Sequence, residues 1–518
     1  MKKIISLLIA ITTIISVLLF ASSCSGGKEE TTSKKETTAA VTTESETNSE
    51  TTLSTEEQTT TGQTTEDVTT EPTGREKMPG YEDIDFGGLV FLFNATVSDP
   101  AENWHDDYTF WVESVKNELI NDAVFDRNEA MKKLYNCSIE VDATGGDAYD
   151  ADLASGAGRY IATSHCYKAL DIASSSYYNV FKLGIDFTQE WWDQDFFRDL
   201  SCNGKLFSMC GSFSLVAYRA VWICYYNKNV YDSKFEGTDI YQIVRDKQWT
   251  FDKMIEFIDR VKYDANGDSE YTFSEGADAD ILGYMSTAHN YRSLYFAGGC
   301  RYVTKSSDDY DGYFVAALND PKGQDTIQAA ITLTQNSGYL ETGYSNCDKG
   351  MANGTTLFVS NVLGQLIDVK DAEGLRLGVL PMPMADENQD GYHHMPDNHA
   401  AFISVPTSYK DISVAADFLT LFAYHSHKLV YPAFLNTYKY IYAHDEESGE
   451  MVDIILNSIC YDPGYLANFS VGFNGYVTTM IQSNKPNQFV QAATKYTKDT
   501  EAKINEYMNK IAAIDDNY

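Results

Sequence analysis

An acidic loop in the middle of the chain has the spacing of a calcium-binding site. Side chains with oxygen ligands occupy positions 1, 3, 5 and 12 of the loop, as in helix–loop–helix calcium proteins: Asp264, Asn266, Asp268 and Glu275. Ser269 stands at position 6, where a glycine normally makes the sharp turn. Two interpretations therefore stay open, a structural Ca²⁺ site and an acidic turn that follows a helix. No other cofactor is predicted.

Two further clusters of acidic and histidine residues have a pattern that could hold a metal. Residues 386–391 together with Asp397 repeat the acidic spacing, but they lie between two strand-like runs, where a hairpin turn is favoured. His393, His394 and His399 surround the same aspartate. Zinc needs three or four converging ligands, and adjacent histidines diverge, so a polar loop is the favoured interpretation.

The chain lacks the common sequence signatures of catalysis. It contains no G-x-S-x-G, no H-E-x-x-H and no Walker loop. Paired carboxylates of the kind that hydrolyse glycosides cannot be assigned, because 75 Asp and Glu residues are spread along the chain. We therefore predict no enzymatic activity, and an anchored carbohydrate-active enzyme remains the alternative.

The first residues resemble a bacterial lipoprotein signal. Met1–Lys3 is positively charged, an uncharged run extends from Ile4 to Phe20, and small residues precede Cys24. This layout predicts that residues 1–23 are a signal peptide and that acyl chains such as palmitate on Cys24 hold the exported chain at the outer face of the cell membrane. An ordinary secretion signal and a transmembrane helix are the alternatives, although a spanning helix needs about 20 apolar residues.

The composition divides the rest of the chain into a spacer and a body. Residues 24–79 are rich in Thr, Ser and Glu and nearly free of large apolar residues, so they cannot offset their conformational entropy and are predicted to be a disordered tether. Residues 80–518 are too many for one ordinary core, which predicts two lobes. The net charge of −36 argues against binding to nucleic acid phosphates.

Eight cysteines follow Cys24, and their surroundings favour burial. None forms a C-x-x-C pair or lies near a histidine at zinc spacing. Most lie among apolar residues, so we predict small buried side chains rather than disulfides. Cys202 and Cys210 could pair, on the basis of their proximity alone.

The hydrophobic pattern predicts an α/β fold. A buried strand at 89–94, an amphipathic helix at 118–135 and a strand at 138–141 form a βαβ unit, which implies a parallel sheet. Further strand-like and helical patterns recur along the chain, the strands at 160–163, 206–209, 222–226 and 375–380 and the helices at 251–261, 412–424 and 504–514. Thr250 is a natural N-cap for the helix at 251–261, and Trp249 before it is predicted to lie in the core.

Four motifs in a fixed order resemble one protein family. A Tyr-Asn-Lys strand end at 226–228 precedes Trp-Thr-x-Asp at 249–252, Gly-Val-x-Pro-x-Pro at 378–383 and Ala-x-x-Phe-Leu at 415–419. In this order they are similar to the type 1 extracellular solute-binding proteins, the sugar receptors that include maltose-binding protein. The resemblance extends over about residues 85–518.

The resemblance implies a two-lobed, class II periplasmic-binding-protein-like fold with hinge crossings. Lobe one is expected at 85–211 and 350–403, and lobe two at 212–349 and 404–518, with the first crossing at Gly211-Ser212. The implied function is that of a monomeric receptor that binds an oligosaccharide and passes it to ABC permease subunits. A ligand-sensing co-receptor of the same fold is the alternative, because a fold alone does not decide function.

The resemblance also implies a cleft between the lobes, lined by loops that follow the strands. Its aromatic rings would stack on sugar C–H faces, and its polar groups would bond the hydroxyls. The candidate solute-binding residues are Trp104, Asp106, His165, Tyr167, Ser214, Tyr291 and Asn361. Structural roles remain open for them: Trp104 could anchor a surface loop, and His165 and Tyr167 could belong to a helix cap.

Overall fold

A computed structural model describes residues 73–94, 107–142, 147–165, 170, 176–443 and 445–514. The chain divides into two units, Met1–Thr69 and Thr70–Tyr518, and all described residues belong to the second. The predicted signal peptide, the lipid on Cys24 and most of the tether fall outside the described residues and stay predictions. Within the described ranges, no helix has the length and apolar character needed to cross a bilayer.

The first sheet is four-stranded, in the order β11-β3-β1-β2. The parallel strands are β1 (Leu89–Asn94), β2 (Cys137–Asp142) and β3 (Tyr160–His165), and β11 (Ala401–Ser404) pairs antiparallel with β3. Helix α3 (Leu119–Tyr135) connects β1 to β2, which confirms the predicted βαβ unit.

Helix α15 (Ile412–His425) packs against α3 and against the first sheet. Phe418 of α15 stacks on Phe91 of β1 with ring centroids 3.6 Å apart. Residues before the predicted start of the body also pack here, because the Gly74 carbonyl oxygen accepts a bond from His425 and the Met78 amide donates to Tyr135 Oη. The packed part of the chain therefore starts before residue 80.

The second sheet has five strands, in the order β10-β4-β9-β5-β8. These are β4 (Trp222–Asn227), β5 (Leu282–Ser286), β8 (Tyr339–Glu341), β9 (Thr356–Val362) and β10 (Leu377–Leu380). Helix α10 (Phe251–Val261) begins where predicted, with Thr250 Oγ1 accepting a bond from the Lys253 amide at 3.2 Å. Trp249 is fully buried, as predicted, and its indole nitrogen donates to the Pro381 carbonyl.

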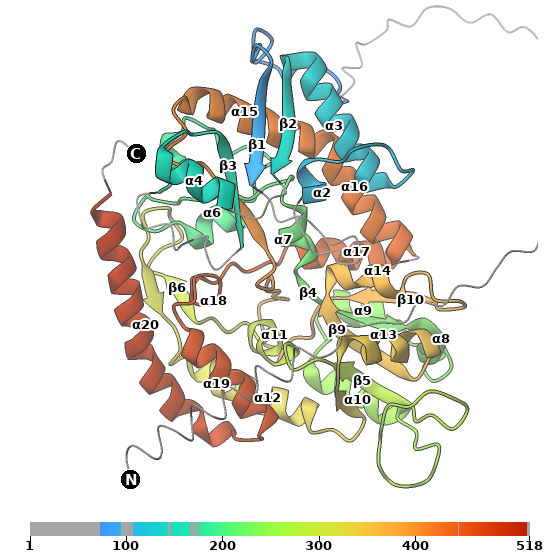
Figure 1. Ribbon diagram of the computed structural model, residues 1–518. Helices are drawn as coiled ribbons and strands as arrows, with labels where there is room; N and C mark the ends of the chain where they lie inside the picture. Colours follow the sequence, from blue (N-terminus) through green and yellow to red (C-terminus); the bar gives the residue numbers. More distant parts are fainter. Residues whose placement is uncertain are drawn as a thin grey trace, which may run out of the picture. The chain divides into compact units, whose positions relative to one another are not determined.

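Two chain segments cross between the sheets side by side. Met209 bridges Ile403 near the first sheet, and Val221 bridges Pro396 near the second. The predicted strand at 206–209 is therefore part of a crossing, close to the predicted crossing point, and forms one isolated bridge rather than a ladder. Helix α7 (Leu215–Arg219) lies within this crossing (Figure 1).

The predicted distribution of the lobes is corrected by the strand pairing. Residues 350–403 were assigned to lobe one, but β9 runs antiparallel to β4 with all seven residues buried, and β10 covers the other side of β4. Conversely, α15 and α16 (Tyr431–Asn436) pack against α3 of the first lobe (Figure 1). A local sequence pattern predicts whether a segment is a strand or a helix but not which sheet it joins, so only the pairing and packing partners assign these elements to a lobe.

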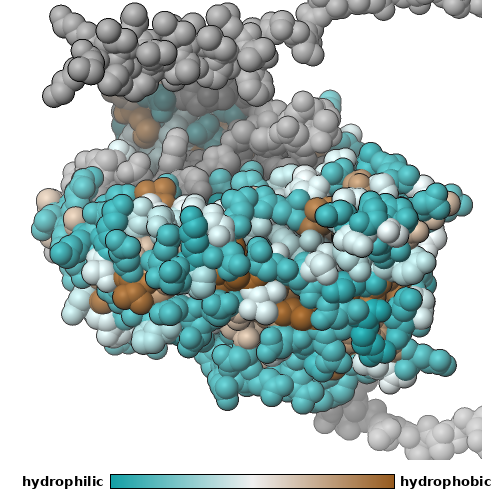
Figure 2. Space-filling view, turned by 90° about the horizontal axis from the view of Figure 1, so that it is seen from below, coloured by the Kyte–Doolittle hydropathy of each residue, from teal (hydrophilic) through white to brown (hydrophobic). Residues whose placement is uncertain are grey.

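The last helices pack on the second lobe. The C-terminal helices are α17 (Glu446–Leu456), α18 (Pro463–Leu466), α19 (Val471–Gln482) and α20 (Phe489–Ala512). Helix α17 packs against β10, α19 against α12 (Pro321–Thr334), and α20 against β7 (Phe314–Ala316), which forms a hairpin with β6 (Val303–Lys305). Seen from below, the surface is mostly hydrophilic with separate hydrophobic patches (Figure 2).

The described cysteines are free and buried. They are Cys137, Cys202, Cys210, Cys224, Cys300, Cys347 and Cys460. This confirms the prediction of small buried side chains for these residues, and Cys202 and Cys210 do not pair.

Candidate functional site

Two parallel strands of the second sheet, β5 and β8, lead into helices at the same edge of the sheet. Strand β5 ends at Ser286 and leads into α11 (Asn290–Ala297), and β8 ends at Glu341 before α13 (Tyr344–Asn353). Ligands of open α/β sheets are usually held outside the carboxyl ends of strands. We call the residues gathered at this edge the strand-edge cluster: Trp222, His289, Arg292, Tyr344, Asp397 and His399.

Asp397 is the centre of the strand-edge cluster. Its carboxylate accepts bonds from Trp222 Nε1 at 3.2 Å and Arg292 at 3.3 Å, and it pairs with His399 Nδ1 at 2.8 Å. The backbone amide of Asp397 donates to the Ala220 carbonyl in the other crossing segment. Burial alone would raise the pKa of Asp397, but the bond with His399 and the charge of Arg292 hold it below its usual value. A buried carboxylate thus stays ionised at the junction of both crossings.

An exposed aromatic ring lies beside this carboxylate. Tyr344, the first residue of α13, is 43% exposed. The His289 ring lies parallel to it, with the centroids 6.2 Å apart. A flat ring next to ionised and hydrogen-bonding groups is the combination that sugar-sized polar ligands require.

The buried polar atoms near the same edge that have no hydrogen-bond partner among the described protein atoms include Tyr225 Oη, Asp348 Oδ1 and Asn361 Nδ2. Ile223 pairs with Asn361 across β4 and β9, so Tyr225 and Asn361 share a face of the sheet. Asp348 lies one helical turn after Tyr344 on α13. We call these three residues the buried polar set.

The carboxyl group of Asp348 has an unusual charge state. Burial, and then the charge of Asp368, raise the pKa of Asp348 to about 7. Gln365 donates to both carboxylates, at 3.4 Å to Asp348. A buried polar atom without a partner costs about 1–3 kcal/mol, so a hydroxylated ligand that bonds this set would recover free energy.

A family model described as "Bacterial extracellular solute-binding protein" matches residues 139–428 of the 518. The chain belongs to this family. The strand-edge cluster therefore lies in a solute-binding protein, at the sheet edge where α/β folds bind ligands.

Two solved structures are similar to this solute-binding protein. One is a cyclo/maltodextrin-binding protein complexed with maltotetraose, at 12% identity and a TM-score of 0.52, covering 80% of this chain and 97% of that chain. Another is the maltose-bound MalE3 of T. maritima, at 12% identity and a TM-score of 0.47, covering 80% of this chain and 99% of that chain. No curated protein sequence matches the chain. The first likeness confirms the predicted maltose-binding-protein-like fold.

Of the predicted solute residues, the structure brings Asn361 to the second-lobe edge, within the buried polar set. Tyr291 is buried in α11, and its hydroxyl donates to Glu341 at the end of β8 at 2.5 Å, so its ring ties the helix to the sheet. Ser214 is buried at the start of α7, and its Oγ accepts a bond from the Gly211 amide at 3.2 Å. Their roles in solute binding stay predictions.

The other predicted contacts belong to the first lobe. Trp104, Asp106 and Tyr167 lie outside the described residues. His165 ends β3 and pairs through its backbone with Ala401, and its side chain is not described. Strands β1, β2 and β3 run parallel, so the chain segments after them start from one edge of the first sheet.

Arg127 fixes the segment that follows Trp104 and Asp106. Its guanidinium donates to the carbonyl oxygens of Thr109 and Phe110 in α2 (Asp107–Phe110) and lies 4.2 Å over the Phe422 ring. Complete burial lowers the pKa of Arg127 to about 9. The sequence predicts an amphipathic helix at 118–135, which includes Arg127, but no local pattern predicts the partners of this side chain.

The acidic loop at 264–275 is closed by its own backbone. The two oxygens of Asp264 accept bonds from the amides of Gly267 and Ser269, and Glu275 pairs with Lys349 at 2.7 Å. Ser269 has a φ of 69°, the left-handed conformation that glycine usually supplies. Among the described residues, no group of three or more His, Cys, Asp or Glu side chains could hold a metal ion. The geometry fits the acidic-turn interpretation, and calcium binding by Asp264, Asn266, Asp268 and Glu275 stays a prediction.

Histidine 394, part of the second predicted cluster, has a structural role. Its Nε2 accepts a bond from the Met382 amide at 3.0 Å, and its Nδ1 lies 2.8 Å from Ser458 Oγ. Burial lowers the pKa of His394 to about 3. The ring is therefore neutral and joins the end of β10 to the segment after α17, in agreement with the polar-loop interpretation.

Proposed function

We propose that the protein is a lipid-anchored extracellular receptor that binds an oligosaccharide at the strand-edge cluster and delivers it to an ABC importer. Membership of the extracellular solute-binding family supports an exported binding protein. The observation that carries the solute class is the combination of the exposed Tyr344 ring, the ionised Asp397 and the unpartnered atoms of the buried polar set. The maltotetraose complex of the structural relative is consistent with this ligand class.

Each part of the edge has a chemical role in this proposal. The Tyr344 ring packs against a sugar C–H face. Asp397 and Arg292 form an acceptor and a donor side by side, which suits neighbouring hydroxyl groups. The buried polar set then forms hydrogen bonds with further hydroxyl groups, which offset the free-energy cost of its unpaired buried atoms.

Solute binding is coupled to the lobes through the crossings. Asp397 belongs to the second crossing and bonds the first through Ala220, so a solute on Asp397 contacts the hinge itself. A solute stabilises the closed form only if it binds that form more tightly than the open one. First-lobe residues such as Trp104 and Asp106 would complete the closed site.

The anchor on Cys24 serves the transport step. Acyl chains keep the receptor in the membrane plane, which raises its effective concentration at the permease. A Cys24→Ser variant should appear in the culture medium rather than in the membrane fraction. Retention of that variant in membranes would contradict lipidation at Cys24.

Binding is tested with the mature chain and a panel of mono- to tetrasaccharides, by thermal shift and calorimetry, with chromatography of each sugar afterwards. We expect at least one sugar to raise the melting temperature, as ligand linkage requires, and every sugar to remain intact. Arg292→Gln should weaken that binding, whereas Asp264→Asn in the remote acidic loop should not. Cleavage of a sugar, or equal binding by the Arg292→Gln variant, would overturn the proposal.

A further inference from the structure

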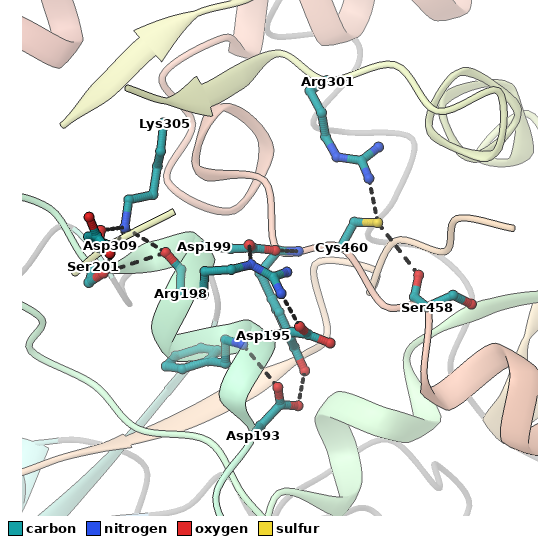
Figure 3. Close-up of polar contacts among 12 residues, drawn as sticks. Asp193, Asp195, Arg198, Asp199, Ser201, Arg301, Lys305, Asp309, Ser458 and Cys460 are labelled. Atoms are coloured by element: carbon teal, nitrogen blue, oxygen red, sulfur yellow. Dashed lines mark hydrogen bonds and ion pairs between the residues drawn. The ribbon is translucent and has the colours of Figure 1, made fainter. Parts of the chain in front are cut away.

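A polar cavity, separate from the strand-edge cluster, lies between α6 (Gln194–Leu200) and β6. Its volume is about 550 Å³, within the range of small-molecule sites. We call it the interlobe cavity, and its lining includes Arg198, Asp199, Arg301, Lys305, His393 and Cys460. Figure 3 shows the charged side chains of α6 on one side and, on the other, Arg301 with its guanidinium directed toward the Cys460 sulfur.

The walls of the interlobe cavity come from both lobes. Helix α6 packs on the first sheet, because the centroid of the Phe196 ring lies 4.6 Å from that of Phe402 in β11. The opposite wall belongs to the second lobe, where Asp462 caps α18 and accepts a bond from the Tyr302 amide just before β6. A group attached in this space would therefore touch both lobes without contacting the strand-edge cluster.

A thiol, an imidazole and a carboxylate lie in series at the wall formed by the second lobe. Cys460 Sγ lies 3.6 Å from His393 Nδ1, and His393 Nε2 lies 2.9 Å from Asp390 Oδ1. Arg301 also contacts Nδ1, at 3.2 Å, and an arginine can only donate, so Nδ1 is an acceptor and the ring proton is on Nε2. Asp390 therefore holds the imidazole in the tautomer whose free nitrogen faces the thiol, which is the arrangement that activates a cysteine nucleophile.

The thiol of Cys460 needs this base. Burial raises the pKa of Cys460, although the charge of Arg301 acts in the opposite direction, so the sulfur carries its proton at neutral pH. Burial and the charge of Arg301 lower the pKa of His393, so the imidazole is neutral at pH 7 and can accept that proton. The Arg301 guanidinium also donates to Cys460 Sγ, which stabilises negative charge as it develops on the sulfur.

Charges of both signs surround this pair. The groups that act on Cys460 and His393 are Asp199 of α6, Arg301, Lys322 of α12, Asp390 and Asp462. Burial raises the pKa of Asp462 to about 6, so this carboxyl is largely ionised above pH 7. A lining with both charges suits a zwitterion such as cystine, in which each end carries an ammonium and a carboxylate group.

We propose that Cys460 is a site of covalent modification by small disulfides, with cystine as the simplest zwitterionic example. Cys460 Sγ attacks one sulfur of the disulfide, the S–S bond of that molecule breaks, and a new S–S bond joins Cys460 to one half of it. The thiol proton passes to His393 Nδ1 and then to the leaving sulfur, so one thiol is consumed, one is released, and the disulfide is the only oxidant.

The location of the protein is consistent with this chemistry. Small disulfides persist where thiols are not kept reduced, as they are outside the cell, and the chain belongs to an extracellular family. The site depends on its own side chains and not on the function proposed for the strand-edge cluster.

The test incubates the reduced mature chain with L-cystine and follows adduct formation by intact mass and peptide mapping. We expect one cysteinyl group on Cys460, which an added thiol releases again. His393→Gln, which removes the base and keeps the thiol, should slow the reaction by about tenfold or more. Cys300→Ser is the control and should react at Cys460 as fast as the wild type, because Cys300 Sγ bonds Thr326 Oγ1 at 3.3 Å and does not line the cavity.

The pH dependence of the wild-type rate keeps the test valid if thermal melting shows that His393→Gln does not fold. With a neutral base and a protonated thiol, this rate should change by less than about twofold from pH 7 to pH 8. A thiol that reacts without a base gains about tenfold over the same range, because only its thiolate attacks. Absence of an adduct on Cys460 in the folded wild type, a tenfold rise of its rate over this range, or an unchanged rate in folded His393→Gln would overturn the proposal.

Discussion

The strand-edge cluster and the interlobe cavity are lined by similar side chains, but they use their hydrogen bonds differently. At the strand edge, Tyr225, Asp348 and Asn361 each keep a buried polar atom without a protein partner. In the cavity, Lys305 donates three bonds to α6 and to its own hairpin, and Arg198 pairs with two carboxylates.

A ligand at the strand edge would therefore add hydrogen bonds, whereas a ligand in the cavity would have to replace existing ones. A solute at the strand edge satisfies atoms whose desolvation is already a cost of folding, so its binding recovers free energy. A molecule in the interlobe cavity replaces bonds that already stabilise the contact between the lobes. We therefore expect tight reversible binding at the edge, whereas a molecule in the cavity is retained by its covalent bond to Cys460.

The largest expected effect is that of Asp397→Asn, which breaks the centre of the strand-edge cluster. The change leaves Arg292 without its carboxylate and removes the charge that orients His399. Removing one partner of a buried ion pair costs about 3–5 kcal/mol. We expect solute affinity to fall by roughly a hundredfold or more, about 3 kcal/mol, measured by calorimetry.

Asp264→Asn is the matched control for that substitution, because it also replaces one aspartate but lies in the acidic turn. Its affinity should equal that of the wild type. An Asp397→Asn protein that melts normally and binds with unchanged affinity would remove the strand-edge cluster from the solute site.

The next largest effect is expected from a substitution in the cavity, and it should lower the free energy of unfolding rather than the tight solute affinity. Lys305→Met removes charged bonds to the Arg198 carbonyl, Ser201 Oγ and the Asp309 carbonyl, so the free energy of unfolding should fall by about 2 kcal/mol. Lys349→Met, which breaks an exposed pair with Glu275, should cost less than about 1 kcal/mol.

Urea unfolding measures both lysine variants, and calorimetry measures their tight solute binding. The comparison of the two regions predicts that Lys305→Met changes tight affinity by less than about twofold, because the strand edge is untouched. A large loss of tight affinity in Lys305→Met would show that the two regions form one site.

A smaller effect is expected from the exposed ring. Tyr344→Ala removes the flat surface beside Asp397 and should weaken solute binding by about tenfold, or about 1.4 kcal/mol. Tyr313→Ala, in a similarly exposed tyrosine of the β6–β7 hairpin, should leave it unchanged. Fluorescence or calorimetric titration measures the solute affinity of both variants. Equal affinities would exclude stacking of the solute on Tyr344.

Local signals in the sequence predicted much of the fold, and long-range pairing explains what was missed. The Thr250 cap, the strand β1 and the helix α3 are each decided within about ten residues, and all three are confirmed as elements. The predicted burial of β1 is wrong for its first half, because Leu89 and Val90 are exposed and only Phe91 and Phe93 are buried.

Arg292 and Asp397 are separated by 105 residues, and no local pattern links them. The sequence did group Asp397 with neighbouring histidines, but as a possible metal cluster. Its other partners come from distant elements, Arg292 from helix α11 and Trp222 from strand β4.

The smallest expected effect is a pH dependence of solute affinity at the strand edge. The pKa of Asp348 is raised to about 7 chiefly by burial, so this carboxyl loses its proton near neutrality. A solute that covers the edge would exclude more water and disfavour the charged form further, and protonated Asp348 can donate to a solute hydroxyl oxygen, so binding favours protonated Asp348. Solute affinity should therefore be highest below pH 7 and fall a few-fold as the pH rises from 6 to 8.

Asp348→Asn keeps a neutral side chain at every pH, so its affinity should stay flat from pH 6 to 8, close to the wild-type value at pH 6. The rate at which Cys460 reacts with cystine should be the same in Asp348→Asn and in the wild type at each pH, because Asp348 does not line the interlobe cavity. Calorimetric titrations of both proteins at pH 6, 7 and 8 make the comparison. An Asp348→Asn protein that keeps the wild-type pH dependence would show that another group titrates at the strand edge, and the raised pKa of Asp348 would then have no part in solute binding.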